Sequence, residues 1–550
     1  MTATARKHLA STTHSRRRPL MTLSAALTAV LLALSGVGAG TGVAAAGAGP
    51  RGAPIVKTDG GAVRGTTVAG IYEFRGVPYA APPTGDLRWR PPERAPKWRG
   101  VREASGFAPS CPQQDGIFAP PGEMSEDCLY LNVYTPGRLD HRASRRPVLV
   151  WIHGGGLATD GALNYDPTQL AAEGTVVVTI NYRLGALGFL AHPALASRPG
   201  GPSGNYGLMD QQAALRWVQR NIRAFGGNPR NITIAGQSAG GLSVLAHLVS
   251  RDSRGLFQKA IVQSGAFALA QLSLADAEAF GQAFAANPDV GCADQTARCL
   301  RRVAIEALVS SFPTAAIPGV VDGNVLTESI GTALSAGRFA RVPILNGSNQ
   351  LEELIFVAGL GVAVSGGTFV GLNPPQVTDQ NYLQHIKATL GVSDARAAAI
   401  AAEYPIASYP SATVAFSALV GDANFACTAL QLIEWTSARV PTFAYDFNDD
   451  TAPPLYAPFP AATHSSELPY LFDLPNAPFQ VPLNADQQRL SGSMRAAWAS
   501  FAATGDPSTA ALRWPSFNDD GHGMSFVAPQ PQLDTEFAAR HRCAFWAAGG

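Results

Sequence analysis

Short runs of consecutive apolar, largely β-branched residues constrain the fold of this 550-residue chain most strongly. They lie at 148–152 (VLVWI), 175–180 (TVVVTI), 231–235 (NITIA) and 259–263 (KAIVQ). Continuous rather than alternating apolar character is typical of strands buried on both faces of a mostly parallel sheet. Helical spacing at 207–225 and again from Gly236 to Val249 places helices between these strands. The alternation predicts an α/β fold with a central, mostly parallel sheet flanked by helices.

The remaining segments extend this plan without adding an autonomous domain. Residues 270–430 are rich in Ala and predict large helical insertions, 343–345 and 442–447 predict late strands, and 498–504 predicts a terminal helix. The segment 354–369 is apolar and Gly-rich, so it is either a buried helix or a wall or lid of an acyl pocket. No repeat or long linker interrupts the chain, and we expect one domain over residues 47–550.

The N-terminus reads as a secretory signal peptide over residues 1–46. Five basic residues precede a 15-residue apolar run from Leu20 to Leu34, and small residues follow up to Ala46. This order is typical of a cleaved leader, and the run is short for a membrane anchor. Arg16 to Arg18 resemble a twin-arginine signal, but Pro19 stands near the place of the usual aromatic residue, which favours general export. We expect a secreted, extracellular protein.

Charge and composition exclude several classes of protein. Hydrophobic residues make up 46% and charged residues 15% of the chain, which excludes a disordered protein. Removal of the leader would take away five basic residues and no acidic one, so the formal charge would change from +1 to −4. This balance predicts no nucleic-acid partner. No later segment predicts an integral membrane protein, and no feature predicts an oligomeric state.

A Gly-x-Ser-x-Gly sequence, residues 236–240, joins the strand at 231–235 to the next helix. At such a junction the glycines allow a sharp turn that leaves the hydroxyl of Ser238 projecting from the end of the sheet. The helix N-terminus behind it offers free backbone N–H groups. Ser238 is therefore our candidate nucleophile.

A His-Gly-Gly-Gly sequence, residues 153–156, directly follows the strand at 148–152. Glycines let backbone N–H groups approach a carbonyl oxygen closely, as in the oxyanion holes of esterases and lipases. We expect Gly155, Gly156 and Ala239 to form this hole. His153 is expected to be structural.

Ser238 needs a general base and an acid that orients it. Among the later histidines, His464 lies in a loop of small residues beyond a late strand, the position that suits a base. Of the others, His247 lies on the helix after the nucleophile and His385 on an apparent surface helix. His522 and His541 lie in a polar tail. Either Glu352 or Glu353, after the strand at 343–345, could serve as the acid.

Six cysteines behind a leader favour disulfides, and there is no C-x-x-C pair that would suggest a metal site. We prefer two short loops, Cys111–Cys128 and Cys292–Cys299, and a long-range bond, Cys427–Cys543, although spacing alone leaves other pairings open.

Several further motifs resemble the type-B carboxylesterase family, which includes carboxylesterases, cholinesterases and fungal lipases. They occur in order at 74–80 (FRGVPYA), 125–133 (SEDCLYLNV), 181–185 (NYRLG), 204–211 (GNYGLMDQ) and 225–229 (FGGNP), ahead of the Ser238 turn. The resemblance covers nearly all of the chain after the leader. It implies an α/β-hydrolase fold and the triad Ser238, Glu352 and His464. It also implies the oxyanion hole given above and the pairs Cys111–Cys128 and Cys292–Cys299.

The chain departs from the family pattern at three places. Leu351-Glu352-Glu353 replaces the usual Asp-Glu-Gly, so Glu353 stays a rival for the acid. Leu157 replaces the aromatic residue that commonly follows the three glycines, which would alter one pocket wall. The Cys111–Cys128 loop contains no Trp, so nothing supports a choline substrate.

The sequence thus predicts a serine esterase that acts on small or lipid-like carboxylic esters, with no metal or other cofactor. A lipase acting on long-chain acylglycerols and a non-catalytic binding protein of the same fold are the alternatives. Arg183, Asp210, Glu126 and Glu467 are expected to form buried ion pairs or to fasten loops, and Ser264 to support the triad.

Overall fold

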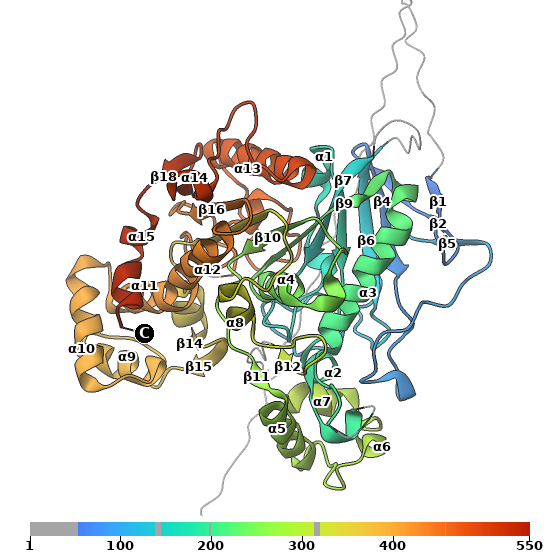
Figure 1. Ribbon diagram of the computed structural model, residues 1–550, viewed down its shortest axis with the longest axis horizontal. Helices are drawn as coiled ribbons and strands as arrows, with labels where there is room; N and C mark the ends of the chain where they lie inside the picture. Colours follow the sequence, from blue (N-terminus) through green and yellow to red (C-terminus); the bar gives the residue numbers. More distant parts are fainter. Residues whose placement is uncertain are drawn as a thin grey trace, which may run out of the picture. The chain divides into compact units, whose positions relative to one another are not determined.

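An eleven-stranded mixed sheet dominates the computed structural model, which describes residues 53–137, 145–196, 198, 200–312, 319–456 and 458–549 (Figure 1). In spatial order its strands are β18 (Gln532–Asp534), β17 (Gly523–Phe526), β16 (Thr442–Phe447), β13 (Ile344–Asn349), β10 (Lys259–Gln263), β9 (Gly227–Gln237), β7 (Arg146–Ile152), β8 (Val176–Ile180), β6 (Tyr130–Pro136), β4 (Ile71–Pro78) and β3 (Thr66–Val68). Neighbouring strands from β17 to β8 pair in parallel. The strands outside them pair antiparallel. The predicted mostly parallel centre is confirmed, and the antiparallel margins are additional.

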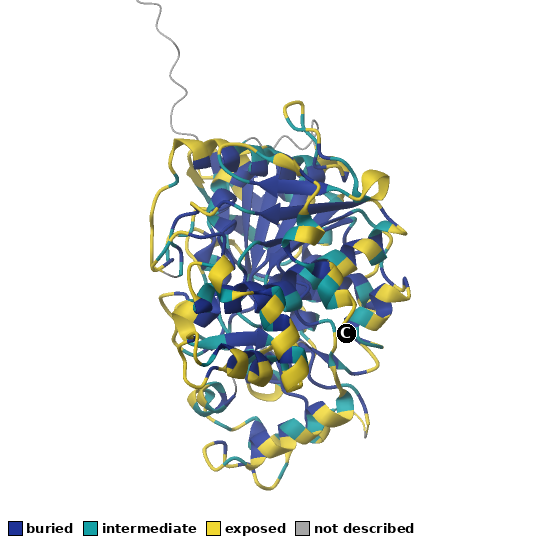
Figure 2. Cartoon of the chain, turned by 90° about the vertical axis from the view of Figure 1, so that its left-hand side faces the viewer, coloured by how far each residue is buried: buried dark blue, intermediate teal, exposed yellow. Residues whose placement is uncertain are grey.

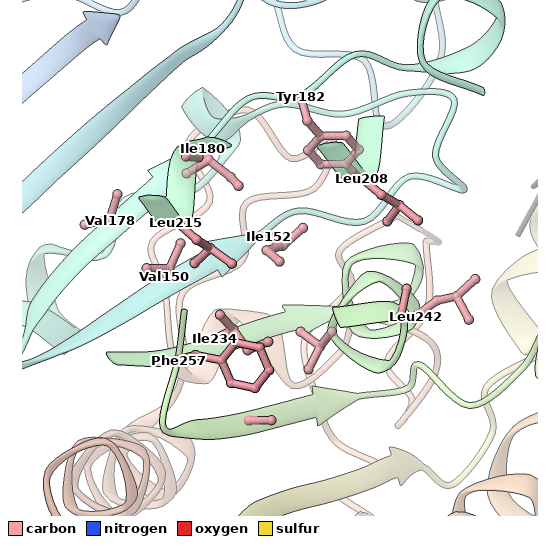
Figure 3. Packing of buried hydrophobic residues seen from close by; sticks show 14 of the residues in the cluster. Val150, Ile152, Val178, Ile180, Tyr182, Leu208, Leu215, Ile234, Leu242 and Phe257 are labelled. Atoms are coloured by element: carbon pink, nitrogen blue, oxygen red, sulfur yellow. The ribbon is translucent and has the colours of Figure 1, made fainter. Parts of the chain in front are cut away.

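Helices cover both faces of the sheet, which explains the continuous apolar runs. Val150, Val178 and Ile234 pack with α3 (Tyr206–Asn221), α4 (Ala239–Val249), α8 (Ile330–Ser335) and α12 (Cys427–Ser437). Figure 3 shows these strand side chains beside residues of α3 and α4. The intervening residues, such as Leu149 and Trp151, pack on the other face with α1 (Thr168–Ala172) and α13 (Ala485–Thr504). Central strands such as β8, β10, β13 and β16 are therefore buried at every residue, whereas the outward turns of the helices are exposed (Figure 2).

The other helices are α2 (Gly185–Phe189), α5 (Leu274–Ala286), α6 (Ala297–Leu300), α7 (Ile305–Ser311), α9 (Tyr382–Leu390), α10 (Asp394–Glu403), α11 (Ala412–Gly421), α14 (Phe517–Asp520), α15 (Phe537–Arg540) and α16 (Cys543–Ala547). Most of them lie between β10 and β16, where the sequence predicts helical insertions. Helix α13 is not terminal as predicted, because two strands and three short helices follow it. The helical stretch Ala412–Ser437 is long and apolar enough to cross a membrane, but 61% of its apolar window is buried, as in a core helix.

Three small sheets stand apart from the central one. They are formed by β1 (Ile55–Lys57), β2 (Ala62–Arg64) and β5 (Val101–Glu103), by β11 (Leu272–Ser273) with β12 (Val320–Val321), and by β14 (Val362–Ser365) with β15 (Thr368–Gly371). The last pair follows a π-helical turn, Ile355–Leu360. The segment 354–369 is thus a helical turn followed by a hairpin, so the prediction of a buried helix holds only for its first residues. Residues of both parts line the cavity described below, as the alternative prediction of a pocket wall requires.

Three disulfides join Cys111 to Cys128, Cys292 to Cys299 and Cys427 to Cys543. These are the pairs that the sequence analysis prefers, and no described cysteine is free. Disulfides of this number are typical of an oxidising environment. The predicted leader, residues 1–46, lies outside the described residues, which form one compact unit from Ala53 onward.

Candidate active site

The carboxyl ends of the central parallel strands bring the candidate residues to one edge of the sheet. Ser238 follows β9, the glycine loop follows β7, and Glu352 follows β13. Strand order reverses at β7, because β8 pairs on one side of it and β9 on the other. In open α/β sheets, ligands bind at such a reversal, beyond the carboxyl ends of the strands.

Ser238 forms the sharp turn that the sequence predicts. Its φ and ψ are 57° and −126°, a strained conformation for a residue with a side chain. The turn is held by its backbone N–H, which donates to the carbonyl of Gln263 at 2.8 Å. A Cβ at Gly240 would lie 2.0 Å from the carbonyl oxygen of Ile152, so only glycine lets α4 pack this closely on β7. The serine side chain faces a cavity at the sheet edge.

The glycine loop borders the same cavity. Gly155 and Gly156 have φ angles of 79° and 64°, and a Cβ on Gly155 would lie 2.2 Å from the carbonyl oxygen of Thr159. Within the described residues, neither glycine N–H donates to a protein acceptor. Ala239 is the first residue of α4, so its N–H also lacks a helical partner. These three groups are available for a ligand oxygen.

Buried polar groups support this loop. Asp160, which lines the cavity, accepts hydrogen bonds from the hydroxyl of Tyr165 at 2.6 Å and the amide of Asn164 at 2.7 Å. Burial raises the pKa of Asp160 and lowers the pKa of His153, whose ring stacks on Tyr182 at 4.4 Å. His153 thus occupies a structural position, as expected.

Two loops hold the candidate base and acid together. Nδ1 of His464 lies 2.6 Å from a carboxylate oxygen of Glu352, and both side chains are buried. The other oxygen of Glu352 accepts the backbone N–H of Asn349 at 2.8 Å. A carboxylate at Nδ1 favours the tautomer with a proton there, so Nε2 is left to accept one. His464 and Ser238 line one cavity.

Gln237, which the sequence analysis did not single out, contacts the candidate base directly. Its amide nitrogen lies 3.1 Å from Nε2 of His464, and its buried side chain is part of the cavity lining. An amide N–H can only donate, so Nε2 of His464 acts as the acceptor. The only signal in the sequence is that Gln237 precedes Ser238 in the turn.

Glu353, the rival acid, points elsewhere. Both of its carboxylate oxygens lie 3.1 Å from the backbone nitrogen of Val364, and the structure gives it no hydrogen bond to His464 among the described residues. Burial raises its pKa well above the usual value, and the carboxylate of Glu352 adds to this shift.

The loop-fastening role expected for Glu467 agrees with its contacts. It accepts from the amides of Asn349 at 2.7 Å and Gln263 at 3.1 Å. Arg183 pairs with Asp210 at 2.7 Å, as predicted. Arg88 likewise pairs with Glu126 at 2.6 Å.

Two sequence expectations fail near the cavity. The hydroxyl of Ser264 is buried without a hydrogen-bond partner among the described residues, so it does not bond the triad. Leu157 does not line the cavity but packs into the main hydrophobic cluster.

The cavity has a volume of about 390 Å³ and a largely apolar lining. Seven aromatic side chains contribute to it: Phe118, Tyr165, Phe267, Phe356, Phe369, Phe425 and Tyr456. Two of them pack on the candidate base, with ring centroids of Phe356 and Phe425 at 5.1 and 5.3 Å from that of His464. No Lys or Arg of the described chain lines the cavity.

The remaining histidines lie away from this site. His247 bonds Gln211 and Ser253, and burial lowers its pKa to about 3. His385 lies on α9, which is a surface helix as predicted because residues such as Leu383 and Lys387 are exposed, but the His385 side chain is on its buried side.

His541 is also buried, although it is expected in a polar tail. Its two ring nitrogens lie 2.6 Å from Asp422 and 3.0 Å from Asp446. Burial alone would lower the pKa of His541, but Asp446 and Asp422 raise it to about 10. This charged histidine ties the C-terminal segment to the π-helical turn after α11 and to β16. Within the described ranges, no three His, Cys, Asp or Glu side chains are grouped to hold a metal ion.

Comparison with known proteins identifies the family. Residues 52–546 match the model of the carboxylesterase family. The chain is similar to a cocaine esterase from Oryctolagus cuniculus, with 36% identity over 90% of this chain and 95% of the relative. It is also similar to a fumonisin B1 esterase from Sphingopyxis macrogoltabida (35%, 86% of each chain) and a para-nitrobenzyl esterase from Bacillus subtilis (33%, 85% and 93%). The chain therefore belongs to the carboxylesterase family, and it is a carboxylic-ester hydrolase with the α/β-hydrolase fold.

Proposed function

We propose that Ser238, His464 and Glu352 are the nucleophile, general base and orienting acid of this hydrolase. The observation that carries the proposal is the 2.6 Å contact between His464 and Glu352, in a cavity that His464 shares with Ser238. Glu352 fixes the proton on Nδ1 of His464 and stabilises the imidazolium that forms during reaction.

In the first half of the reaction, the hydroxyl oxygen of Ser238 attacks the ester carbonyl while Nε2 of His464 takes the hydroxyl proton. The N–H groups of Gly155, Gly156 and Ala239 bind the resulting oxyanion. Each such donor contributes about 2.7–4 kcal/mol to transition-state stabilisation. The imidazolium then protonates the alcohol oxygen as the carbon–oxygen bond breaks, which leaves an acyl group on Ser238.

In the second half, water replaces the alcohol. His464 takes a proton from the water as its oxygen attacks the acyl carbonyl, and returns that proton to the oxygen of Ser238 as the acid leaves. The chain supplies every group that these steps need. The proposed chemistry requires no metal or organic cofactor.

The cavity favours esters that are uncharged and apolar near the reacting carbonyl. Its lining is mainly aromatic and aliphatic, and the exposed side chain of Asp115 at its border is negative. No described Lys or Arg is placed to neutralise an anionic substrate. The carboxylate of Asp115 would repel an anionic substrate, so we propose neutral alkyl or aryl esters as the substrate class.

We also propose that the protein is exported and works outside the cytoplasm. The three disulfides suit an oxidising compartment, and the basic, apolar and small-residue order of residues 1–46 suits a leader for general export.

Hydrolysis of p-nitrophenyl butyrate by the mature protein tests the proposal. We expect Ser238→Ala to lower kcat by at least about 10³-fold and Glu352→Gln by about 10³–10⁴-fold. Ser243→Ala, on the same helix but outside the cavity, is the matched control and should keep most of the activity.

Three outcomes would redirect the proposal. Substantial activity in Ser238→Ala would contradict the mechanism. A folded wild type without activity on any ester would favour a non-catalytic binding protein. A jump in rate above the solubility limit of the substrate would favour a lipase.

A further inference from the structure

One wall of the cavity is a hairpin that stands outside the central sheet. Strands β14 and β15 pair only with each other among the described strands, and Val362, Val364, Thr368 and Phe369 line the cavity. Gly366 and Gly367 at the turn have φ angles of 56° and 84°, as a two-residue hairpin turn requires. A two-stranded ribbon is only marginally stable alone. The position of this wall therefore depends on its attachments to the rest of the protein.

Glu353 supplies one of these attachments. In the hairpin, Ser365 pairs with Thr368 next to the turn, so Val364 and Phe369 form the following pair. In antiparallel strands such alternate pairs point their N–H groups away from the partner strand. The N–H of Val364 is left unpaired by the hairpin, and it donates instead to the carboxyl group of Glu353, with both oxygens at 3.1 Å.

The carboxyl group of Glu353 works here without a charged partner. Its side chain is fully buried, and no ion pair with a described basic residue involves it. Burial raises its pKa well above the usual value, which favours the neutral acid. The carboxyl oxygen accepts from the Val364 N–H, and the amide oxygen of glutamine can accept in the same way.

The hairpin is connected to the reacting centre through packed rings. Phe369 contacts Phe356 with ring centroids 5.3 Å apart, and Phe356 contacts His464 at 5.1 Å. Glu353 is also the direct neighbour of Glu352 along the chain. A shift of the hairpin would change the room beside the ester carbonyl without removing any group of the triad.

We propose that Glu353 is a positioning residue for substrate selection: by holding β14 at Val364, it fixes the cavity wall that limits the size of the ester group accepted beside Ser238. The inference rests on the proposed ester hydrolysis at Ser238. It assigns to Glu353 a role different from that of the acid at Glu352.

The test compares Glu353→Gln with Glu353→Met, which have similar size but differ in the hydrogen-bond acceptor. The ratio of kcat/KM for p-nitrophenyl butyrate to that for p-nitrophenyl octanoate is measured at pH 7 for both variants and the wild type. We expect Gln to keep the wild-type ratio within about twofold, because it still accepts from Val364. Met cannot accept from Val364 and so releases β14, and we expect it to change the ratio by about fivefold or more.

A second variant tests the same wall from its tip, and it keeps the inference open to refutation if Glu353→Met does not fold. A Cβ at Gly367 would lie 2.4 Å from Cβ of Ala268, so Gly367→Ala must displace the hairpin. We expect this variant also to change the ratio.

An unchanged ratio in every folded variant, or a ratio that changes equally in Gln and Met, would overturn the role of Glu353. Loss of stability alone, with the ratio unchanged, would show a purely structural residue and would likewise overturn it. Failure of the proposed function would look different, because the wild type would then hydrolyse neither ester or Ser238→Ala would hydrolyse both.

Discussion

The substitution Gln237→Glu would place a carboxylate where a neutral amide now contacts the candidate base. The side-chain nitrogen of Gln237 lies 3.1 Å from Nε2 of His464, and both side chains are buried. In the wild type this amide donates to the lone pair that must accept the proton of Ser238, so it favours the neutral imidazole. A carboxylate at the same place would favour the imidazolium.

The size of the effect follows from this separation. Opposite charges about 3 Å apart attract by about 5 kcal/mol at an effective dielectric constant of about 20, and desolvation of the carboxylate offsets part of this attraction. Opposite charges at slightly longer range shift titrations by about 1–3 pH units. We expect the acidic limb of the pH profile to move upward by that amount, because the base stays protonated to higher pH.

The assay is kcat/KM for p-nitrophenyl butyrate from about pH 4 to about pH 9, with release of p-nitrophenol followed at its isosbestic wavelength. Gln237→Leu, which removes the amide without adding a charge, is the matched control and should move the limb by less than about 0.5 pH unit. A folded Gln237→Glu enzyme whose acidic limb stays within about 0.5 pH unit of the wild type would refute the reasoning.

Three further predictions concern stability and the oxyanion loop. His541 has a pKa of about 10 in the fold, against about 6.5 when unfolded, so its contribution to stability is complete below about pH 6.5 and is lost as the pH rises through about 10. His541→Gln should flatten this slope in urea unfolding, and an equal slope in both proteins would contradict the assignment. The Cys427–Cys543 bond spans 116 residues, so replacing both cysteines by serine should lower the free energy of unfolding by about 5 kcal/mol on the chain-entropy model; a loss below about 1 kcal/mol would refute this. Gly155→Ala should lower kcat by about 10²-fold because its N–H is displaced, whereas Gly106→Ala, where a Cβ meets open space, should change kcat little. Equal rates in these two variants would argue against the loop's role.

The centre of the fold could be predicted because the central strands are apolar on both faces. Each residue of β8 is buried, alternately under α3 and under α1, so the sequence shows an unbroken run. The antiparallel strands at the edge of the sheet beside β8 could not be predicted in this way, because their apolar runs are interrupted. Strand β4 carries Glu73 and Arg75, which pair with each other at 2.6 Å, and such charges interrupt the apolar run by which a buried strand is recognised.

The candidate site was predictable only where its signals are local. The turn around Ser238 and the glycine loop are short contiguous motifs, and their places after strands follow from the same pattern. The contact between Gln237 and His464 joins residues 227 positions apart, so no local pattern contains it. The role of Glu353 was hidden as well, because its hydrogen bond with Val364 joins two different elements 11 residues apart, and no local motif contains that pair.

The central claim is that Ser238 carries the acyl group during turnover. The most direct test is to treat the wild-type protein with an alkyl fluorophosphonate, which phosphonylates activated serines, and to locate the adduct by peptide mass spectrometry. We expect one phosphonyl group per chain, on Ser238, with loss of esterase activity in proportion to labelling and much slower labelling of Glu352→Gln. Inactivation with the adduct on another residue, or full activity after complete labelling of Ser238, would contradict it.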